Sequence, residues 1–168
     1  LMGGHSIGAG EFHLKDYFAP NDDLLAQPGD AFKIAMESIN GARTYVAAMC
    51  IGMISDALSK AIAYGKQRQS FGKPLMDHQG LKWSLVDVAA QLESLTLLTT
   101  KAGLQIVKGE DAVLSAAMAK KVAGDITIPA LTACIQAMGA SGLKSETLLG
   151  HHMACAKIAA FTDGSTEM

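Results

Sequence analysis

The segment YGKQRQSFGKPLMDHQ, from Tyr64 to Gln79, concentrates chemistry that the rest of the chain lacks. It carries several cations, three glutamines, Phe71 and a glycine–proline turn between two apolar, alanine-rich stretches. A guanidinium such as that of Arg68 makes directed, charge-assisted hydrogen bonds to anions. A cation at a helix C-terminus is equally explained by the helix dipole. The residues alone leave both interpretations of Arg68 open.

Helices are predicted on both sides of this connection. Apolar residues recur at three- and four-residue steps from 31 to 68 without a proline, which predicts one helix approaching 40 residues. Further helices are predicted over about 77–108, 111–138 (with Pro129 inside) and 145–160. Four helices with short connections predict an all-α, antiparallel, up-and-down four-helix bundle. The inward positions expected on the first two helices are Phe32, Ala35, Met36, Ile39, Val46, Met49, Ile51, Met53, Ile54, Leu58, Ile62 and Ala63, then Leu81, Leu85, Val88, Leu92, Leu95 and Leu98.

The first 30 residues have a different composition, rich in Gly, Pro and Asp. The stretch FHLKDYFAP is compatible with a short strand followed by a turn. We interpret residues 1–30 as the non-helical or β end of a preceding domain with its linker, and residues 31–168 as the helical bundle.

Composition narrows the classes of partner. The chain of 168 residues is 49% hydrophobic and has a net charge of -2 with scattered basic residues, which does not favour nucleic acid. The chain contains no run of eighteen uninterrupted apolar residues, so no membrane span is predicted. Cys50, Cys134 and Cys155 are widely spaced, which is typical of reduced, buried thiols. No metal site is expected, because the adjacent His151 and His152 would point about 100° apart on a helix.

The spacing within Tyr64–Gln79 resembles the signature of the acyl-CoA dehydrogenases, a family of flavoenzymes. Two further blocks resemble the family, GDAFKIAMESINGAR around Arg43 and QAMGASGL around Gln136. The resemblance implies the C-terminal four-helix bundle of a larger subunit, with the end of its middle β-domain, so the isolated fragment is expected to be inactive. The signature positions matched in order and spacing are Tyr64, Arg68, Phe71, Gly72, Pro74 and Gln79.

The resemblance also implies an FAD cofactor bound at a dimer interface, in a homodimer or homotetramer. It implies that Arg68 pairs with the pyrophosphate of the neighbouring subunit's FAD, and that Phe71 packs beside the adenosine. It places Gln136 and Gly139 at the adenine end of the cofactor. The remaining cofactor-binding candidates are Ser70, Gln79, Ser165 and Glu167.

A catalytic base is implied by the same resemblance. The segment FTDGSTE, residues 161–167, matches a Tyr-Glu-Gly-Thr motif and places Asp163 at the base that removes the α-proton of an acyl thioester, while hydride passes to flavin N5. Asn40, Arg43 and Gly164 are the substrate-binding candidates. Because aspartate is one methylene shorter than glutamate, three interpretations stay open: a shifted or cyclic substrate, a relative of the nitroalkane oxidases, or a degraded site.

The predicted function is therefore α,β-dehydrogenation of an acyl-CoA by an FAD-dependent oxidoreductase of fatty acid metabolism, with an electron-transferring flavoprotein as electron acceptor. The alternatives are a flavin oxidase or monooxygenase of the same superfamily, and a non-catalytic helical oligomerisation module. Acyl chain length is not predicted. A bacterial cytoplasm is the expected compartment, with the mitochondrial matrix also open.

Overall fold

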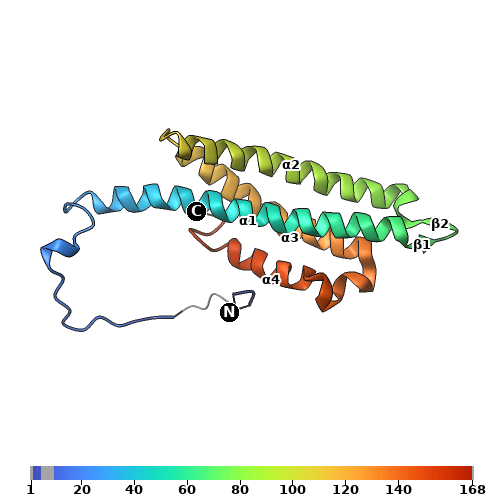
Figure 1. Cartoon of the computed structure of the whole chain (residues 1–168), viewed down its shortest axis with the longest axis horizontal. Coiled ribbons are helices and arrows are strands. Elements are labelled where there is room, and N and C mark those ends of the chain that lie inside the picture. Colours follow the sequence, from blue (N-terminus) through green and yellow to red (C-terminus); the bar gives the residue numbers. More distant parts are fainter. Residues whose placement is uncertain (1, 5–9, 168) are drawn as a thin grey trace.

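The computed structural model describes residues 2–4 and 10–167, and four α-helices account for most of them. They are α1 (Ala31–Gln67), α2 (Gln79–Val107), α3 (Val113–Met138) and α4 (Leu149–Ala159). Successive helices run in opposite directions along one long axis (Figure 1). This arrangement confirms the predicted all-α, up-and-down bundle.

Small side chains let the helices approach closely at the core. Helix α3 is central, since it packs against α1, α2 and α4, and most extensively against α1. Large apolar side chains fill the remaining space and are fully buried at Ile54, Leu95, Leu131 and Leu149. The alanines of these helices that are fully buried are Ala47, Ala57, Ala61, Ala102, Ala116, Ala119 and Ala123.

The predicted inward faces are confirmed on α2 and only partly on α1. Leu85, Val88 and Leu95 of α2 are buried, as expected. On α1 the prediction is wrong at Phe32, which is 78% exposed, and at Ala35, Met49 and Ala63, which are also exposed. The first turns of α1 project beyond the ends of the other helices, so no neighbouring helix covers them (Figure 1).

A small β-hairpin joins α1 to α2. Strands β1 (Gln69–Ser70) and β2 (Lys73–Pro74) pair in antiparallel register, with Gln69 opposite Pro74. Phe71 and Gly72 have φ values of 50° and 79°, the positive pair that a tight two-residue hairpin turn requires. A 3₁₀ turn over Leu75–Asp77 follows, and α2 begins two residues later than predicted.

The connection from α3 to α4 corrects the predicted start of the fourth helix. It consists of two 3₁₀ segments, Gly139–Leu143 and Ser145–Thr147, and α4 begins at Leu149 rather than near 145. Leu148 adopts left-handed backbone with φ 60°, which interrupts the helical path. Helix α3 itself continues across Pro129.

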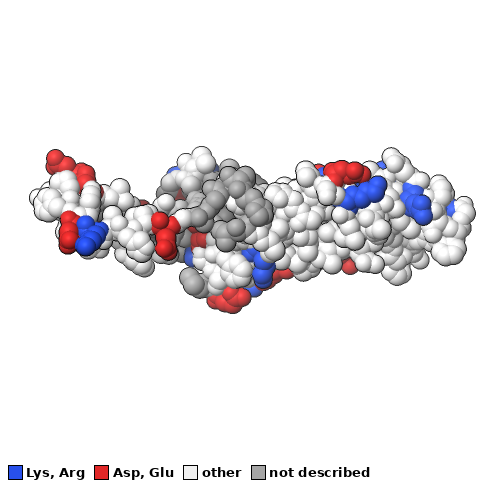
Figure 2. All heavy atoms as spheres, turned by 90° about the horizontal axis from the view of Figure 1, so that it is seen from below, with Lys and Arg blue, Asp and Glu red and all other residues white. Residues whose placement is uncertain are grey.

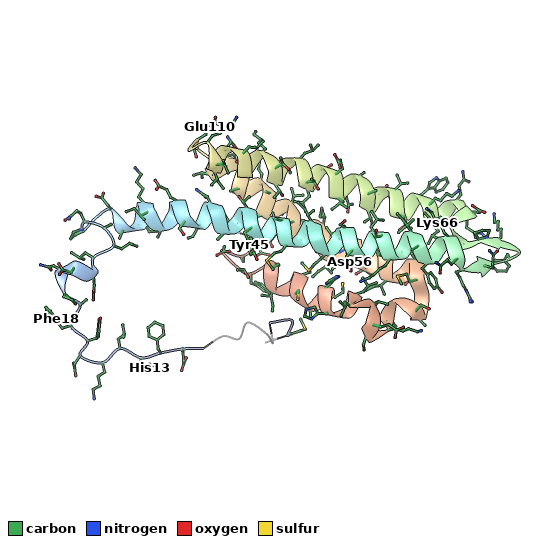
Figure 3. All side chains as sticks on the ribbon, in the orientation of Figure 1. His13, Phe18, Tyr45, Asp56, Lys66 and Glu110 are labelled. Carbon is green, nitrogen blue, oxygen red and sulfur yellow. The ribbon has the colours of Figure 1, made fainter. Side chains whose placement is uncertain are left out.

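An ion-paired cluster fastens α4 to α1. The Lys60 Nζ donates to Asp56 Oδ2 at 2.6 Å and to the Thr147 carbonyl at 2.7 Å. His152 Nε2 lies 2.8 Å from the same Asp56 oxygen. Figure 3 shows Asp56 on α1, with α4 running below it. The cluster holds the start of the short fourth helix in place.

The N-terminal segment contains no strand among residues 10–30, so the strand expected in FHLKDYFAP is wrong. Only a 3₁₀ turn, Asn21–Asp23, interrupts an exposed path. A strand needs a partner edge for its backbone hydrogen bonds, and the described residues offer none beside this segment.

Helices α1 and α3 are long and apolar enough to cross a membrane by length and composition, with 44% and 39% of the tested windows buried. Core helices of helical bundles also pass this test of length and composition. Helices α1 and α3 pack against each other in the core of this bundle.

Candidate functional site

The predicted site residues fall into two groups at separate places along the bundle. The hairpin group consists of Arg68, Ser70, Phe71, Gln79, Gln136 and Gly139, and the loop group consists of Arg43, Asp163, Gly164, Ser165 and Glu167. Arg43 and Arg68 are 25 positions apart on α1, or about 37 Å at ~1.5 Å per helical residue. The two groups therefore cannot act on the same atoms within one chain.

The hairpin group is open to solvent. Phe71 is 96% exposed, and Arg68 and Gln79 are also exposed. Arg68 forms no ion pair within residues 2–4 and 10–167. Its backbone is fixed all the same, because its N–H donates to the Tyr64 carbonyl and its carbonyl accepts from Leu75. Figure 2 shows that cationic side chains reach this end of one face of the molecule.

His78 supports the hairpin from below. Its Nε2 lies 3.1 Å from the Ser70 carbonyl oxygen, and its ring meets the Phe71 ring edge-on at 6.3 Å between centroids. The sequence reasoning did not select His78. Its place at the last position before a helix, eight residues after Ser70, gave no signal without the hairpin.

The glycine-rich end of α3 lies at the same end of the bundle. The Ser141 hydroxyl lies within 3.5 Å of the Tyr64 hydroxyl, which ties this segment to the end of α1. Gly139 has φ 58° and ψ -143°, backbone that favours glycine. Gly142 is buried, and an added Cβ would lie 2.9 Å from the Ile135 carbonyl oxygen. Gln136 is exposed beside them.

The loop group lines a cleft of about 410 Å³. Arg43 contributes from α1, Lys120 and Met118 from α3, and residues 163–167 form the remaining wall. The described end of the chain lies beside the first half of α1, where Arg43 contacts Asp163 (Figure 1). The structure thus brings Arg43, a basic residue, next to the aspartate selected as the base.

The backbone of this loop takes a tight, strained path. Asp163 and Gly164 have φ values of 56° and 103°. A non-glycine residue in the left-handed region costs about 1–2 kcal/mol and is retained when its surroundings hold it there. Here Arg43 Nε donates to the Asp163 carbonyl at 3.2 Å, and Lys120 Nζ donates to the Gly164 carbonyl at 3.1 Å.

The Asp163 side chain is half-buried, and its carboxylate makes no hydrogen bond within the described part of the chain. A carboxylate without such a partner at a cleft is available to accept a proton. Glu167 is exposed, and a hydrogen bond from Ser165 lowers the pKa of its carboxyl. It therefore remains ionised near neutral pH, beside the same cleft.

Asn40 differs from the other substrate-binding candidates. It lies one turn before Arg43, is buried, and is not among the residues that line the cleft. Its Oδ1 has no hydrogen-bond partner among the described residues. A buried polar atom without a partner is uncommon.

Lys120 is the main residue that sequence reasoning missed. It is 4% exposed and lies on the buried stripe of α3 with Ala116, Ala123 and Thr127. A lysine at the inward position of an otherwise small and apolar stripe was a readable signal, because lysine is almost never fully buried without a partner.

Comparison with known proteins places the chain in a family. The model of the acyl-CoA dehydrogenase C-terminal domain matches residues 29–168. The short-chain specific acyl-CoA dehydrogenase of Megasphaera elsdenii is 35% identical over 99% of this chain and 44% of its own length. The human mitochondrial short-chain enzyme is 32% identical over 92% of this chain and 38% of its own. The chain belongs to the acyl-CoA dehydrogenase family, and its residues 29–168 match the C-terminal domain of that family.

Two solved structures agree with this assignment. Butyryl-CoA dehydrogenase from Megasphaera elsdenii superimposes with a TM-score of 0.84 at 36% identity, over 88% of this chain and 39% of that one. A chain from a structural study of the electron transferring flavoprotein of Acidaminococcus fermentans gives 0.83 at 32% identity over the same shares. The present chain thus spans less than half the length of these relatives.

Proposed function

We propose that the full-length protein containing this chain is an FAD-dependent acyl-CoA dehydrogenase that introduces an α,β double bond into an acyl-CoA thioester. The observation that carries this proposal is the position of Asp163, which lies in a cleft between Arg43 and Lys120 with an unpaired carboxylate. We further propose that residues 1–30 belong to the end of the middle domain, which agrees with a family match that begins at residue 29.

In this mechanism Asp163 accepts the α-proton of the substrate. The proton moves to a carboxylate oxygen of Asp163. Because Arg43 fixes the backbone of Asp163, little reorganisation of the loop is needed as the C–H bond breaks. Ser165 and Glu167 line the same wall and are proposed to contact the cofactor, while Arg43 and Gly164 contact the substrate. Because the Asn40 amide is buried, we propose that Asn40 stabilises the turn of α1 before Arg43 and does not contact the substrate directly.

The residues of the hairpin group fit a flavin nucleotide supplied at a subunit interface. The Phe71 ring is almost fully exposed on fixed backbone, Arg68 has no ion pair among the described residues, and Gly139 has open space around its Cα. We propose that Arg68 binds the pyrophosphate, with Ser70 and Gln79 nearby, and that Gln136 and Gly139 meet the adenine end. When bound, FAD supplies the acceptor for two electrons and the β-hydrogen.

The substrate class is proposed to be short-chain acyl-CoA. The support is the similarity, at 30% identity or above, to proteins described as short-chain specific and to a butyryl-CoA dehydrogenase. The aspartate at the base position does not oppose this class, because a substrate that lies correspondingly closer to the loop of residues 163–167 would meet the shorter side chain.

We propose a homodimer or homotetramer that passes electrons to an electron-transferring flavoprotein, in a bacterial cytoplasm. Exposed apolar side chains along the outer face of α2 support self-association; these are Trp83, Val86, Leu97 and Leu104. The similarity to a chain from the Acidaminococcus fermentans study supports the electron acceptor.

The test is anaerobic bleaching of the flavin absorbance in the full-length protein, titrated with straight, branched and cyclic acyl-CoAs of increasing length. We expect rapid bleaching by butyryl-CoA and weaker bleaching by long or branched thioesters. Bound flavin that no acyl-CoA bleaches would contradict the proposed reaction and favour an oxidase of other substrates. A preparation that binds no flavin would favour a non-catalytic module.

A further inference from the structure

Lys120 occupies a position where an unpartnered lysine would be costly. It is buried on α3, between Ala116, Ala119 and Ala123, which are themselves fully buried. Burial lowers the pKa of Lys120; charge attraction from Cys50 and Asp163 raises it, Arg43 lowers it, and Glu167 raises it. The net direction is downward, so the environment is unfavourable to the charge and some compensating contact is required.

The compensating contacts all lie on the loop that carries the base. Lys120 Nζ donates to the Ala160 carbonyl at 3.3 Å and to the Gly164 carbonyl at 3.1 Å. These two carbonyls lie on either side of Asp163, so one ammonium group fixes the backbone before and after it. Together with Arg43, which holds the Asp163 carbonyl, α1 and α3 bind three carbonyls of the five residues from 160 to 164.

Gly124, one turn after Lys120 on α3, also contacts the segment that follows the loop. An added Cβ at Gly124 would lie 2.5 Å from the Thr166 Oγ1, so only glycine leaves room for that side chain. The Thr166 hydroxyl in turn donates to the Ala160 carbonyl at 3.3 Å. Lys120 and Gly124 thus form one seat on α3, which we call the loop seat.

We propose that Lys120 is a positioning residue for the dehydrogenation: it holds the strained 160–164 backbone on the loop seat so that the Asp163 carboxylate faces the cleft. This inference rests on the proposed function of Asp163 as the base. Without the ammonium group, the Arg43 bond to the Asp163 carbonyl is the remaining side-chain hydrogen bond to the backbone of 163–164 among the described residues. A displacement of about 1 Å at the base is expected to slow proton removal about 100-fold.

The experiment compares three variants of the full-length protein. Lys120→Met keeps the apolar part of the side chain and removes the hydrogen-bond donors and the positive charge. Lys120→Arg keeps the donors and the charge. Lys33→Met, at an exposed lysine in the first turn of α1, is the matched control. We expect Lys120→Met to lower the rate of flavin bleaching at saturating acyl-CoA about 100-fold, with flavin content and KM within about twofold of wild type. Lys120→Arg should recover part of the rate, and Lys33→Met should match wild type.

Two measurements separate positioning from a general loss of structure. Lys120→Met added to Asp163→Asn should lower the rate no further, because the lysine acts through the aspartate. Hydrogen exchange of the amides in 160–167 should accelerate in Lys120→Met while the rest of α3 stays protected. If Lys120→Met does not fold, Gly124→Ala tests the same seat, since its Cβ displaces Thr166 and should slow bleaching by about tenfold.

The outcomes distinguish this inference from the proposed function. If acyl-CoA bleaches the wild type and a folded Lys120→Met at the same rate, Lys120 does not position the base. Fully additive losses in the double variant would also overturn the inference, since they assign Lys120 an effect independent of Asp163. A wild type that no acyl-CoA bleaches would overturn both the inference and the proposed function.

Discussion

The hairpin end and the loop end of this bundle hold their candidate residues in opposite ways. At the hairpin end, the backbone is fixed by Tyr64, Leu75 and His78, and the side chains of Arg68 and Phe71 are left exposed. At the loop end, side chains of α1 and α3 fix the backbone of the loop, and residues of both helices line the cleft beside it.

The difference indicates what each end still lacks. The backbone of the hairpin is held by hydrogen bonds, while its Arg68 and Phe71 side chains are exposed. This arrangement suits a surface that binds another molecule. The loop is strained and held from within, which suits a group whose position must be set before a ligand arrives. Variants at the two ends should therefore fail differently, one in binding and the other in the rate of reaction.

The largest expected effect is at the loop end. Asp163→Asn in the full-length protein should lower the rate of flavin bleaching by saturating acyl-CoA about 10²- to 10⁴-fold, because an amide cannot accept the α-proton. Flavin content should stay near wild type. Asp125→Asn, at an exposed aspartate paired with Lys121 on α3, provides the control. A flavin-free Asp163→Asn would mean that the two ends do not divide binding from chemistry.

Asp163→Glu sharpens the same point. The added methylene moves the carboxylate forward by about 1 Å, which should cost up to about 100-fold if the site is built around aspartate. Stopped-flow bleaching of this variant at the rate of wild type or above would show instead that the cleft accommodates a glutamate equally well.

The next effect is expected at the hairpin end. Arg68→Ala should weaken FAD binding about 10- to 100-fold, the usual contribution of hydrogen bonds to a charged group. At saturating FAD, the bleaching rate should stay within a few-fold of wild type. Fluorescence titration of the apoprotein measures the affinity, and Lys66→Ala, at an exposed cation two residues earlier, is the control. A normal affinity with a slow reaction would reverse the assignment of the two ends.

A smaller effect concerns stability at alkaline pH. Burial raises the pKa of Cys134, near the hairpin end, to about 11 from 9.0. It also raises the pKa of Cys50, near the loop end, where a hydrogen bond from Thr127 and then the charge of Lys120 oppose the change. Above pH 9 the unfolded chain loses the thiol proton while the folded protein retains it. The stability is thus complete below pH 9 and falls as pH rises to about 11, by about 2 kcal/mol for Cys134.

Cys134→Ala should flatten this loss, and Cys50→Ala should flatten it less. Denaturant unfolding of the full-length protein at pH 8, 9 and 10 measures the difference. Equal slopes in the two variants would mean that Thr127 and Lys120 together do not offset the effect of burial on Cys50.

The smallest effect is at the cluster that fastens α4. Burial acts to raise the pKa of Asp56, but the hydrogen bonds from Lys60 and His152 lower it overall. The contribution is therefore present above the ordinary aspartate pKa and is lost as pH falls through the lowered value. Because Asp56 is 39% exposed, Asp56→Asn should cost only ~0.5–1 kcal/mol at neutral pH and nothing in strong acid. Urea unfolding at pH 2 and pH 7 checks both values.

Much of the fold could be predicted because helical periodicity is local. The ends of α1 and α2 were placed within about two residues, since Gly72 and Pro74 mark the connection. The start of α4 was misplaced by four residues, because nothing in the local sequence announces left-handed backbone at Leu148. The exposure of Phe32 depends on how far the other helices reach, which periodicity does not contain.

The candidate site could be predicted only in part from the sequence. The spacing from Arg68 to Gln79 selected the hairpin, yet its turn geometry, with Phe71 in a positive-φ position, came only from the structure. Lys120 could not be linked to Asp163 from sequence, because the two lie 43 positions apart and meet through backbone carbonyls. Main-chain acceptors carry no residue identity, so no pattern of side chains signals them.

Helix α1 connects both ends without a break over its 37 residues. Each residue inserted or deleted between Arg43 and Tyr64 would shift one end by ~1.5 Å and turn it by about 100° relative to the other. Such a change would set the hairpin and the cleft out of phase, and no neighbouring loop could absorb it. The spacing along α1 should therefore tolerate substitution but not a change in length, whereas the turn at residues 108–112 should tolerate a change in length.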